Sequence, residues 1–317
     1  MKNKQKKTFI YLVPKKRKKQ YNECSEIIII KEFIKLGYTI IPIKNFYIMN
    51  LIIKLITNKI DGIIVNSIKI LSKNNLVLKF NLIVPIYWWY FDNPFLKDKN
   101  YNKSIKIAKN VSLYFNKHQS RFNYYRKMNI KPVWLDQGIT SDFQFLETQY
   151  FKYDIIFLGS LNLVHDTRTE ILKKIDEKYN LTIFTPSREK FKKLGFKNIL
   201  PAVAHNKINQ IVAKSKITLV LNATTNEDYC WSNRIHLMLG NGAFCLTDYI
   251  VGLENSYTDG KDCIFIKDLN TIYQKINYWL TDDTLAKRNK IRFNGFNKAN
   301  KKHTYKNRIH SFIKNIK

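Results

Sequence analysis

Small and polar side chains gather around one arginine in the C-terminal half of this 317-residue chain. Ser232 and Asn233 come directly before Arg234, and two glycines follow at Gly240 and Gly242. An arginine at the start of a helix can donate two parallel hydrogen bonds to phosphate oxygens, and the helix N-terminus adds a favourable dipole. Ser232 and Asn233 suit the capping position of such a helix and could also bind ligand oxygens. The pattern predicts a site for a phosphate-bearing ligand.

A structural role is the alternative for each of these residues. Arg234 could form a salt bridge with Glu227 or Asp228 in the preceding loop. Gly240 and Gly242 could simply allow a helix and a strand to pack closely, because a Gly-x-Gly pair alone is a weak signal. We favour the phosphate role for Arg234 and leave packing and ligand contact open for the glycines.

Two further turns offer groups that suit a nucleotide or a sugar. Gly159 and Ser160 follow an apolar run, where backbone N–H groups can approach phosphate. Glu254 follows Gly252 after another apolar run, and its carboxylate can accept hydrogen bonds from two neighbouring sugar or ribose hydroxyls. A solvated loop carboxylate is the alternative for Glu254.

The N-terminal half carries two candidates for a catalytic base. Asp92 follows the aromatic run 87–91 and precedes Pro94. Aromatic faces can stack on sugar rings, and an acid beside them could orient or deprotonate a hydroxyl. Core packing of the aromatic run, with Asp92 capping a helix, fits the sequence equally well. His118, in the turn 117–120, is the second candidate.

Apolar runs that alternate with amphipathic segments predict an α/β architecture in the N-terminal half. Gly37 suits the end of the first helix of this half. After residue 135 the chain becomes irregular until residue 150, which we take as the domain boundary. The expected strands lie at 8–13, 38–43, 61–66, 83–89 and 111–115, and the expected helical segments lie at 23–36 and 46–58.

The same alternation restarts in the C-terminal half. It predicts strands at 154–160, 181–184, 217–222 and 243–248, with helices at 167–179, 206–213, 234–239, 270–280, 283–298 and about 304–316. We therefore expect one domain at residues 1–150 and a second at residues 151–317. Ligands bind at the carboxyl ends of the strands in doubly wound sheets, so the site is expected at the turns 159–160, 222–234 and 248–254.

Short motifs run through the C-terminal half in a fixed order and spacing. They are Phe157-Leu158-Gly159-Ser160, Arg168, Ser215 to Leu219, Trp231 to Arg234, Gly240 to Thr247, Gly252-Leu253-Glu254 and His303 to Arg308. In this arrangement they resemble the C-terminal domain of the CgeB-like glycosyltransferases, over roughly residues 150 to 312. In the N-terminal half, the segment Trp89-x-Phe91-Asp92-x-Pro94 looks like the aromatic–Asp–x–Pro element often found in that family.

The resemblance implies a GT-B fold, in which two Rossmann-like, doubly wound domains face each other across a cleft, here with a C-terminal helix. It implies that the C-terminal domain binds a nucleotide-diphospho-sugar donor and that the N-terminal domain binds the acceptor. GT-B enzymes generally need no metal on the diphosphate, and the sequence has no Asp-x-Asp pair suited to a bridging cation. We therefore expect no metal and no cofactor beyond the nucleotide sugar. The candidate catalytic residues are Asp92, Arg234 and His118, and the candidate donor-binding residues are Gly159, Ser160, Ser232, Asn233, Arg234, His236, Gly242 and Glu254.

One departure from the family pattern concerns the donor. Many retaining GT-B enzymes carry two glutamates eight positions apart, and the corresponding positions here are Tyr229 and Leu237. The neighbouring His236 and Asp228 could substitute, although a histidine on a helix is more often packed than catalytic. The departure leaves the donor, and the retention or inversion of configuration, open.

The formal net charge of +31 suggests a polyanionic partner, but its composition weakens that interpretation. Lysine accounts for 46 of the 55 basic residues, and Ile, Asn, Tyr and Phe are also abundant. This combination of residues is typical of a gene with A/T-rich codons. Readout of nucleic acid tends to use arginine, which is scarce here. We expect contact with an anionic membrane surface to be possible, and a nucleic-acid partner to be disfavoured without being excluded.

The four cysteines are scattered, with no metal-ligand spacing, and no signal peptide or spanning segment is convincing. We expect a cytoplasmic protein, with peripheral attachment at the inner face of the membrane as an alternative. The function predicted is transfer of a sugar, of the hexosyltransferase type, from a nucleotide-diphospho-sugar to a glycan, lipid-linked or other acceptor in glycan biosynthesis. The alternatives are a non-catalytic GT-B-like nucleotide-binding protein and a nucleic-acid-directed glycosyltransferase.

Overall fold

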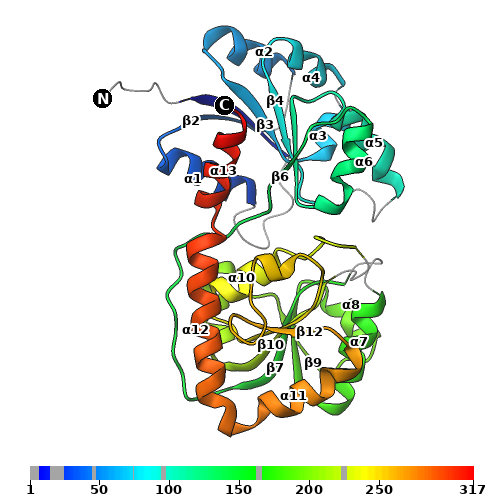
Figure 1. The fold of residues 1–317 in the computed structure, drawn as a ribbon, viewed down its shortest axis with the longest axis vertical. Helices are drawn as coiled ribbons and strands as arrows, with labels where there is room; N and C mark the ends of the chain where they lie inside the picture. The colour runs from blue at the N-terminus through cyan, green and yellow to red at the C-terminus, as the bar shows by residue number, and fades with distance from the viewer. Residues whose placement is uncertain are drawn as a thin grey trace. The chain divides into compact units, whose positions relative to one another are not determined.

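The chain forms two compact units in a computed structural model, which describes residues 7–14, 25–44, 48–73, 75–93, 98–161, 166–222 and 227–317 (Figure 1). The N-terminal unit comprises Met1–Gln137 together with Tyr305–Lys317, and the C-terminal unit comprises Gly138–Thr304. The chain therefore passes from one unit to the other twice. This division differs from the predicted ranges 1–150 and 151–317 in two ways. The first crossing follows Gln137, and the last helix packs within the N-terminal unit.

The N-terminal unit contains one parallel sheet and its covering helices. Its strands are β1 (Thr8–Val13), β2 (Thr39–Lys44), β3 (Gly62–Val65), β4 (Ile86–Trp89), β5 (Leu113–Asn116) and β6 (Pro132–Trp134). Its helices are α1 (Ser25–Lys35), α2 (Ile48–Thr57), α3 (Ile68–Lys73), α4 (Asn75–Lys79), α5 (Asp98–Ala108), α6 (Phe122–Lys127) and α13 (Tyr305–Asn315), with the 3₁₀ turns η1 (Phe80–Leu82) and η3 (Gln119–Arg121).

The strand order β2-β1-β3-β4-β5-β6 gives this sheet two buried faces. Alternate residues of a strand point to opposite faces, so Ile10 and Leu12 pack against α2 to α6, while Phe9 and Tyr11 pack against α1 and α13. Phe312 of α13 lies within 6.1 Å of the Phe9 ring and 4.8 Å of the Phe115 ring, measured between centroids. The terminal helix is thus part of the core of the N-terminal unit.

The C-terminal unit repeats the pattern with a second parallel sheet. Its strands are β7 (Tyr153–Leu158), β8 (Leu181–Thr185), β9 (Asn198–Pro201), β10 (Ser215–Val220), β11 (Cys245–Asp248) and β12 (Ile264–Ile266). Its helices are α7 (Asp166–Lys178), α8 (Arg188–Lys193), α9 (Ile208–Ala213), α10 (Arg234–Gly240), α11 (Ile272–Leu280) and α12 (Leu285–Lys302), with the 3₁₀ turns η4 (His205–Lys207), η5 (Leu253–Asn255), η6 (Leu269–Thr271) and η7 (Asp282–Thr284).

The order of this sheet is β12-β11-β10-β7-β8-β9, which is the Rossmann order 3-2-1-4-5-6 counted within the unit. Strands β8 and β9 are added on one side of β7, and β10 to β12 are added on its other side. The topological switch point therefore lies between β7 and β10, which pair directly. In such a sheet the crevice beyond the carboxyl ends of these two strands is the usual place for a ligand. The sequence around Gly159 and Asn222 therefore lies at the position expected for a site.

Most of the predicted elements are confirmed. Gly37 ends α1 with a φ of 81°, as its position predicted. Several short elements were not predicted, among them α5, α6, β6, α8, β9 and β12. Among the described residues, no helix combines the length and the apolarity needed to span a membrane.

Two glycines allow α10 and α12 to approach each other. A Cβ at Gly240 would overlap the side chain of Ile139, and a Cβ at Gly295 would overlap the carbonyl oxygen of Asp262 and lie 2.8 Å from Leu239 Cδ2. The close approach brings Arg292 of α12 to the carbonyl of Gly242, to which its Nε donates at 2.8 Å. The packing alternative for Gly240 is therefore the one that the structure supports.

We expect Gly295→Ala to lower the free energy of unfolding by about 1–3 kcal/mol, because the added methyl has no room beside backbone that cannot move freely. Asn297→Ala, an exposed change on the same helix, is the matched control and should be close to neutral. Urea unfolding of both variants measures the difference. Equal stability of the two variants would show that α12 can shift to accept the methyl.

Candidate functional site

Three strands of the C-terminal unit end in polar groups at one edge of the sheet. Gly159 and Ser160 follow β7, Asn222 lies just beyond β10, and Asp248 is the last residue of β11. Since β10 pairs with both β7 and β11, these ends are neighbours. The structure thus brings the predicted turns 159–160, 222–234 and 248–254 to a common edge.

Asn222 and Asp248 form the fixed part of this edge. The backbone N–H of Asn222 donates to both carboxylate oxygens of Asp248, at 2.9 and 3.1 Å, and its side-chain Nδ2 donates at 2.5 Å. Asn222 Oδ1 accepts from the backbone N–H of Ser232 at 2.6 Å. This chain of hydrogen bonds ties the loop before α10 to the end of β10, so it sets where Arg234 begins its helix.

Two arginines converge on the same strand ends. Arg234 Nη1 donates to the carbonyl of Leu221 at 3.2 Å, and its guanidinium lies 5.2 Å from the centroid of the Phe157 ring. Arg168, near the start of α7, donates to the carbonyls of Ser160 at 2.7 Å and Leu221 at 3.4 Å, and it lies 5.5 Å from the same ring. Arg168 is 3 % exposed, whereas Arg234 is only partly buried. Arg168 therefore holds the strand ends, and Arg234 is the more accessible cation.

The charges of this cluster perturb one another. Burial raises the pKa of Asp248 to about 6, although hydrogen bonds from Asn222 and the two arginines oppose the rise. Burial lowers the pKa of Arg168 to about 9, helped by the charge of Arg234, and lowers the pKa of Arg234 to about 10. Both arginines stay protonated at neutral pH, so the cluster carries one more positive than negative charge. An anion is the ligand that such a site favours.

Gly159 leaves room for the Arg234 side chain. A Cβ at Gly159 would lie 2.9 Å from Arg234 Nη2 and 2.8 Å from Phe157 Cζ, closer than packed atoms come. Glycine at the end of β7 therefore permits the guanidinium to lie over the strand end. The backbone N–H of Gly159 itself donates to the carbonyl of Phe184 at 3.0 Å, so it is engaged within the sheet.

Three other candidates lie at the same edge with existing partners. Asn233 Nδ2 donates to the carbonyl of Gly138 at 3.3 Å, and the backbone N–H of Arg234 donates to Ser232 Oγ at 3.3 Å. Glu254 is exposed in η5, and its Oε2 accepts from the N–H of Gly252 at 2.9 Å and from the hydroxyl of Tyr249 at 3.0 Å. Glu254 thus remains reachable from solvent, while one of its oxygens orders its own loop.

His236 and Gly242 have packing roles in this structure. The His236 side chain is fully buried, stacks on His303 with ring centroids 4.5 Å apart, and shares a 2.8 Å hydrogen bond with the hydroxyl of Tyr257. Two residues along a helix lie on nearly opposite sides, so His236 is directed away from the side occupied by Arg234. Gly242 ends α10 with a φ of 81° and contacts Phe145. We do not include either residue in the site.

The positions of the missing family glutamates are also occupied by packing residues. Tyr229 has a positive φ of 59°, and its ring lies against Gly252, where a Cβ would overlap it. Leu237 is partly buried against the core formed around α10. Neither position offers a carboxylate to a ribose.

In the N-terminal unit the two predicted base candidates have contrasting environments. Asp92 is exposed, beyond the carboxyl end of β4, and its backbone carbonyl accepts from Asn116 Nδ2 at 3.4 Å. His118 is 1 % exposed, and neither of its ring nitrogens has a hydrogen-bond partner among the described residues. Burial lowers the pKa of His118 to about 3, and the charge of Lys117 adds to the effect while Asp136 opposes it.

The aromatic run before Asp92 packs in the core, so its predicted stacking on sugar rings is not supported. Tyr87, Trp88, Trp89 and Tyr90 are all buried, and the Trp88 ring stacks on Tyr90 at 4.6 Å. The capping alternative for Asp92 involves Pro94, which lies outside the described residues.

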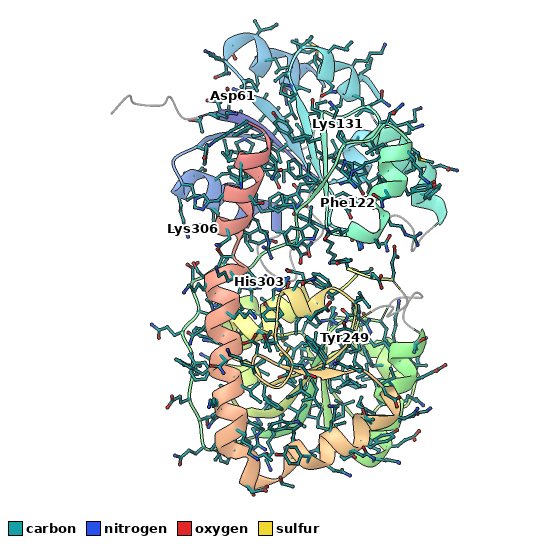
Figure 2. All side chains as sticks on the ribbon, viewed as in Figure 1. Asp61, Phe122, Lys131, Tyr249, His303 and Lys306 are labelled. Atoms are coloured by element: carbon teal, nitrogen blue, oxygen red, sulfur yellow. The ribbon has the colours of Figure 1, made fainter. Side chains whose placement is uncertain are left out.

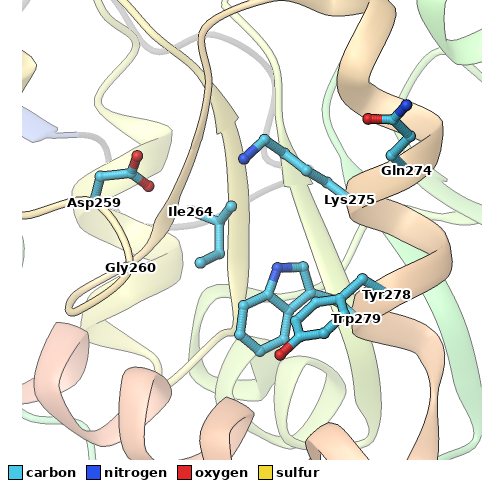
Figure 3. A pocket seen from close by; sticks show the side chains of 7 residues that line it. All are labelled: Asp259, Gly260, Ile264, Gln274, Lys275, Tyr278 and Trp279. Carbon is cyan, nitrogen blue, oxygen red and sulfur yellow. The ribbon is translucent and has the colours of Figure 1, made fainter.

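A hollow elsewhere in the C-terminal unit is unrelated to this cluster (Figure 3). Asp259 and Gly260 precede β12, so the hollow lies at the amino end of that strand, opposite the edge that carries Asp248. Its lining residues are Asp259, Gly260, Ile264, Gln274, Lys275, Tyr278 and Trp279.

Sequence reasoning placed Arg234 and Gly159 in the site but assigned no role to Arg168, Asn222 or Asp248. A detectable signal existed for two of them, since Asn222 and Asp248 are polar residues at the ends of strongly apolar strands. The only sequence signal for Arg168 was its position in the motif series, because the sequence does not show which way an arginine on a helix points.

Comparisons with known proteins come from sequence and from structure. Residues 168–314 match the family model described as glycosyl transferase-like. No curated protein matches the sequence. The matched stretch includes Arg168, Asn222, Arg234 and Asp248, whereas Gly159 and Ser160 lie before it.

Solved structures are similar over nearly the full length. Sucrose-phosphate synthase from Thermosynechococcus elongatus has a TM-score of 0.72 and 8 % identity, with 98 % of each chain covered. Anabaena Alr3699/HepE in complex with UDP-glucose has a TM-score of 0.67 and 12 % identity, covering 98 % of this chain and 99 % of that one. An alpha-glucosyltransferase in complex with UDP and a 13-mer DNA containing a HMU base has a TM-score of 0.67 and 13 % identity, covering 98 % and 100 %. These similarities show the GT-B fold, and the family match supports glycosyl transfer as the class of activity.

The raised pKa of Asp248 predicts how stability depends on pH. The folded protein binds this proton more tightly than an unfolded chain, in which the pKa is 3.8. The contribution of protonated Asp248 to the free energy of unfolding is therefore full below about pH 4 and is lost as the pH rises through about 6. Relative to Asp248→Asn, the wild type should therefore lose about 3 kcal/mol between pH 4 and pH 7. Urea unfolding of both proteins across this range measures the difference, and a constant difference would contradict the burial of an ionisable carboxyl here.

Proposed function

We propose that the protein is a CgeB-like glycosyltransferase that transfers a sugar, of the hexose class, from a nucleotide-diphospho-sugar to a hydroxyl of a glycan or lipid-linked acceptor. The observation that carries the proposal is the pair of arginines at the ends of β7 and β10, with Arg234 accessible over Gly159. Their excess positive charge suits a diphosphate, and their place at the switch point suits a nucleotide.

The chemistry that this arrangement supports is displacement of a nucleoside diphosphate. The bond between the sugar C1 and the β-phosphate oxygen breaks, and a bond forms between C1 and the acceptor oxygen, whose proton passes to a base. Negative charge grows on the departing diphosphate, and a fixed cation lowers the energy of that state most where water is excluded. Arg234 is the residue proposed for this role, and Arg168 positions it through the shared carbonyl of Leu221.

Uridine is the nucleotide that we propose first, because Alr3699/HepE and the alpha-glucosyltransferase are described in complexes with UDP-glucose and UDP. The donor would lie along the edge from Gly159 to Asp248, with Ser160, Ser232 and Asn233 near the phosphates. Glu254, which is exposed at the same edge, is proposed to contact sugar or ribose hydroxyls.

Transfer is proposed to proceed without a metal. The two guanidinium groups would supply the positive charge that a divalent cation provides on a diphosphate in other enzymes. A transfer rate that is unchanged by a chelator and by added magnesium would agree with this role of the arginines. A rate that depends on added metal would contradict it.

Asp92 is the proposed base in preference to His118. A histidine with a pKa near 3 is a weak proton acceptor, and its buried ring cannot reach an acceptor in solvent. Asp92 is exposed at the carboxyl edge of the N-terminal sheet. The buried His118 is proposed to support the turn that carries it.

We expect purified protein to release nucleoside diphosphate from at least one donor in a panel of UDP-, GDP-, ADP- and TDP-sugars. Arg234→Ala should lower the rate roughly a hundredfold, because one contact to the leaving group is lost. Arg188→Ala, an exposed arginine of the same unit, is the matched control and should leave the rate unchanged.

The panel also separates the proposal from its alternatives. Stabilisation of the protein by a nucleotide, with no turnover of any donor, would favour a non-catalytic nucleotide-binding protein. Full activity of Arg234→Ala would remove this residue from the diphosphate site.

Asp92→Asn should reduce transfer by roughly a hundredfold or more while leaving the affinity for nucleotide unchanged, because only the proton acceptor is removed. His118→Gln should retain most of the rate, and Asp142→Asn, an exposed aspartate outside the proposed site, serves as the control. Steady-state rates and nucleotide titrations distinguish the two effects. A loss confined to His118→Gln in a folded protein would reverse the assignment.

A nucleic-acid acceptor is the second candidate, supported by the similar fold of the alpha-glucosyltransferase in complex with DNA and by the net charge of +31. The acceptor arm of the panel should therefore contain DNA with hydroxymethylated bases beside glycans and lipid-linked sugars. Labelled sugar recovered in DNA, with binding that weakens steeply in salt, would select this candidate.

A further inference from the structure

Three of the most exposed apolar side chains lie at one edge of the N-terminal unit. Leu82 is 91 % exposed, Ile56 is 80 % exposed and Ile83 is 78 % exposed. Ile56 lies at the end of α2, which leads into β3, and Leu82 and Ile83 come shortly before β4. Since β3 and β4 pair in parallel, all three residues lie at the amino edge of the sheet.

The outer face of α2 extends this apolar surface. Met49, Ile53 and Ile56 are spaced i, i+4 and i+7, which places them on one side of the helix, and the first two are 60 % and 49 % exposed. Leu51 and Leu55 pack on the opposite side against the core. A helix that is apolar on both its inner and outer faces requires a second apolar environment.

Lysines accompany the apolar side chains at this edge. Lys59, Lys109 and Lys131 are exposed in the loops that lead into β3, β5 and β6, and Lys54 and Lys79 are exposed on α2 and α4. The nearby carboxylate of Asp61 accepts a 2.7 Å hydrogen bond from the backbone N–H of Thr8, which engages it internally. Figure 2 labels Asp61 and Lys131 in this unit.

We propose that this amino-edge surface, made of Met49, Ile53, Ile56, Leu82 and Ile83 with the surrounding lysines, binds an anionic lipid bilayer. Apolar side chains enter the boundary between head groups and acyl chains, and lysines beside them pair with lipid phosphates. A nucleic acid would satisfy the lysines but would leave Leu82 and Ile83 without an apolar partner. The chemistry of the surface therefore matches a membrane.

The edge faces away from the proposed acceptor site within the same unit. Asp92 and His118 lie beyond the carboxyl ends of β4 and β5, whereas the amino-edge surface lies at the opposite ends of these strands. A bilayer bound at the amino edge would therefore leave the carboxyl edge uncovered. A protein attached in this way lies on the surface of the bilayer and needs no membrane-spanning segment.

The test is flotation of the full chain with vesicles of phosphatidylcholine alone or of phosphatidylcholine mixed with phosphatidylglycerol. We expect binding to the mixed vesicles, weaker binding to the neutral ones, and release at high salt because exposed charges are screened. The double variant Leu82→Ser/Ile83→Ser should reduce the vesicle-bound fraction by about tenfold, because two inserted side chains are lost. Leu194→Ser/Leu200→Ser, at exposed apolar positions of the C-terminal unit, is the matched control and should bind like the wild type.

A lysine series tests the charged part separately. Lys59→Gln/Lys109→Gln/Lys131→Gln should lower binding to the mixed vesicles, whereas Lys174→Gln/Lys190→Gln/Lys193→Gln, at exposed positions of the C-terminal unit, should lower it much less. Unchanged melting temperatures confirm that the variants are folded, as expected for exposed positions.

Other outcomes would overturn the proposal. Equal vesicle binding by the wild type and Leu82→Ser/Ile83→Ser would exclude this surface. A dimer that dissociates in Leu82→Ser/Ile83→Ser, with no vesicle binding by the wild type, would assign the surface to a second copy of the chain. Retention on DNA or RNA that is lost in the first lysine series, again without vesicle binding, would assign it to nucleic acid.

Discussion

The buried carboxylate of Asp248 is the interaction on which the candidate site depends. Removing a charged group from water is costly unless hydrogen bonds and opposite charges compensate. Here Asn222 donates to it three times, and the two arginines supply the opposite charge. Asn222 in turn accepts from the backbone of Ser232, which leads directly into α10. The hydrogen bonds that compensate the buried carboxylate of Asp248 thereby determine where Arg234 lies.

Different side chains bond to the backbone groups at the carboxyl ends of the strands in the two sheets. In the C-terminal unit the ends of β7 and β10 are linked by arginines, which leave a positive edge. In the N-terminal unit Asn116 donates to the carbonyl of Tyr90 at 3.0 Å and accepts from the backbone N–H of His118 at 2.8 Å. At these strand ends an amide side chain, and not an arginine, bridges the neighbouring backbone groups.

Apolar runs that alternate with amphipathic segments were sufficient to predict two α/β arrays, because parallel strands buried on both faces are apolar throughout, whereas the GT-B fold came from the family resemblance. The site was predicted at Gly159, which follows a strand, and at Arg234, which begins a helix after small polar residues. The pattern did not reveal that the side of α10 that carries His236 packs in the core. The aromatic run before Asp92 illustrates the same limit, because Trp88 and Trp89 both pack in the core, on opposite faces of the sheet. Periodicity tells which residues share a side of a helix or strand, but tertiary packing decides which of those sides is buried.

The terminal helix α13 has a consequence for how the chain is made. Tyr305, Ile309 and Phe312 complete the aromatic core around Phe9 and Phe115, yet they follow the entire C-terminal unit in sequence. During synthesis the first strands emerge long before their last partner, so the C-terminal unit can finish folding first. Until α13 is released, α1 alone among the described helices covers this face of the N-terminal sheet, and the part that α13 packs on stays open to water. The core of the N-terminal unit can therefore be completed only after the last residues of the chain have been made.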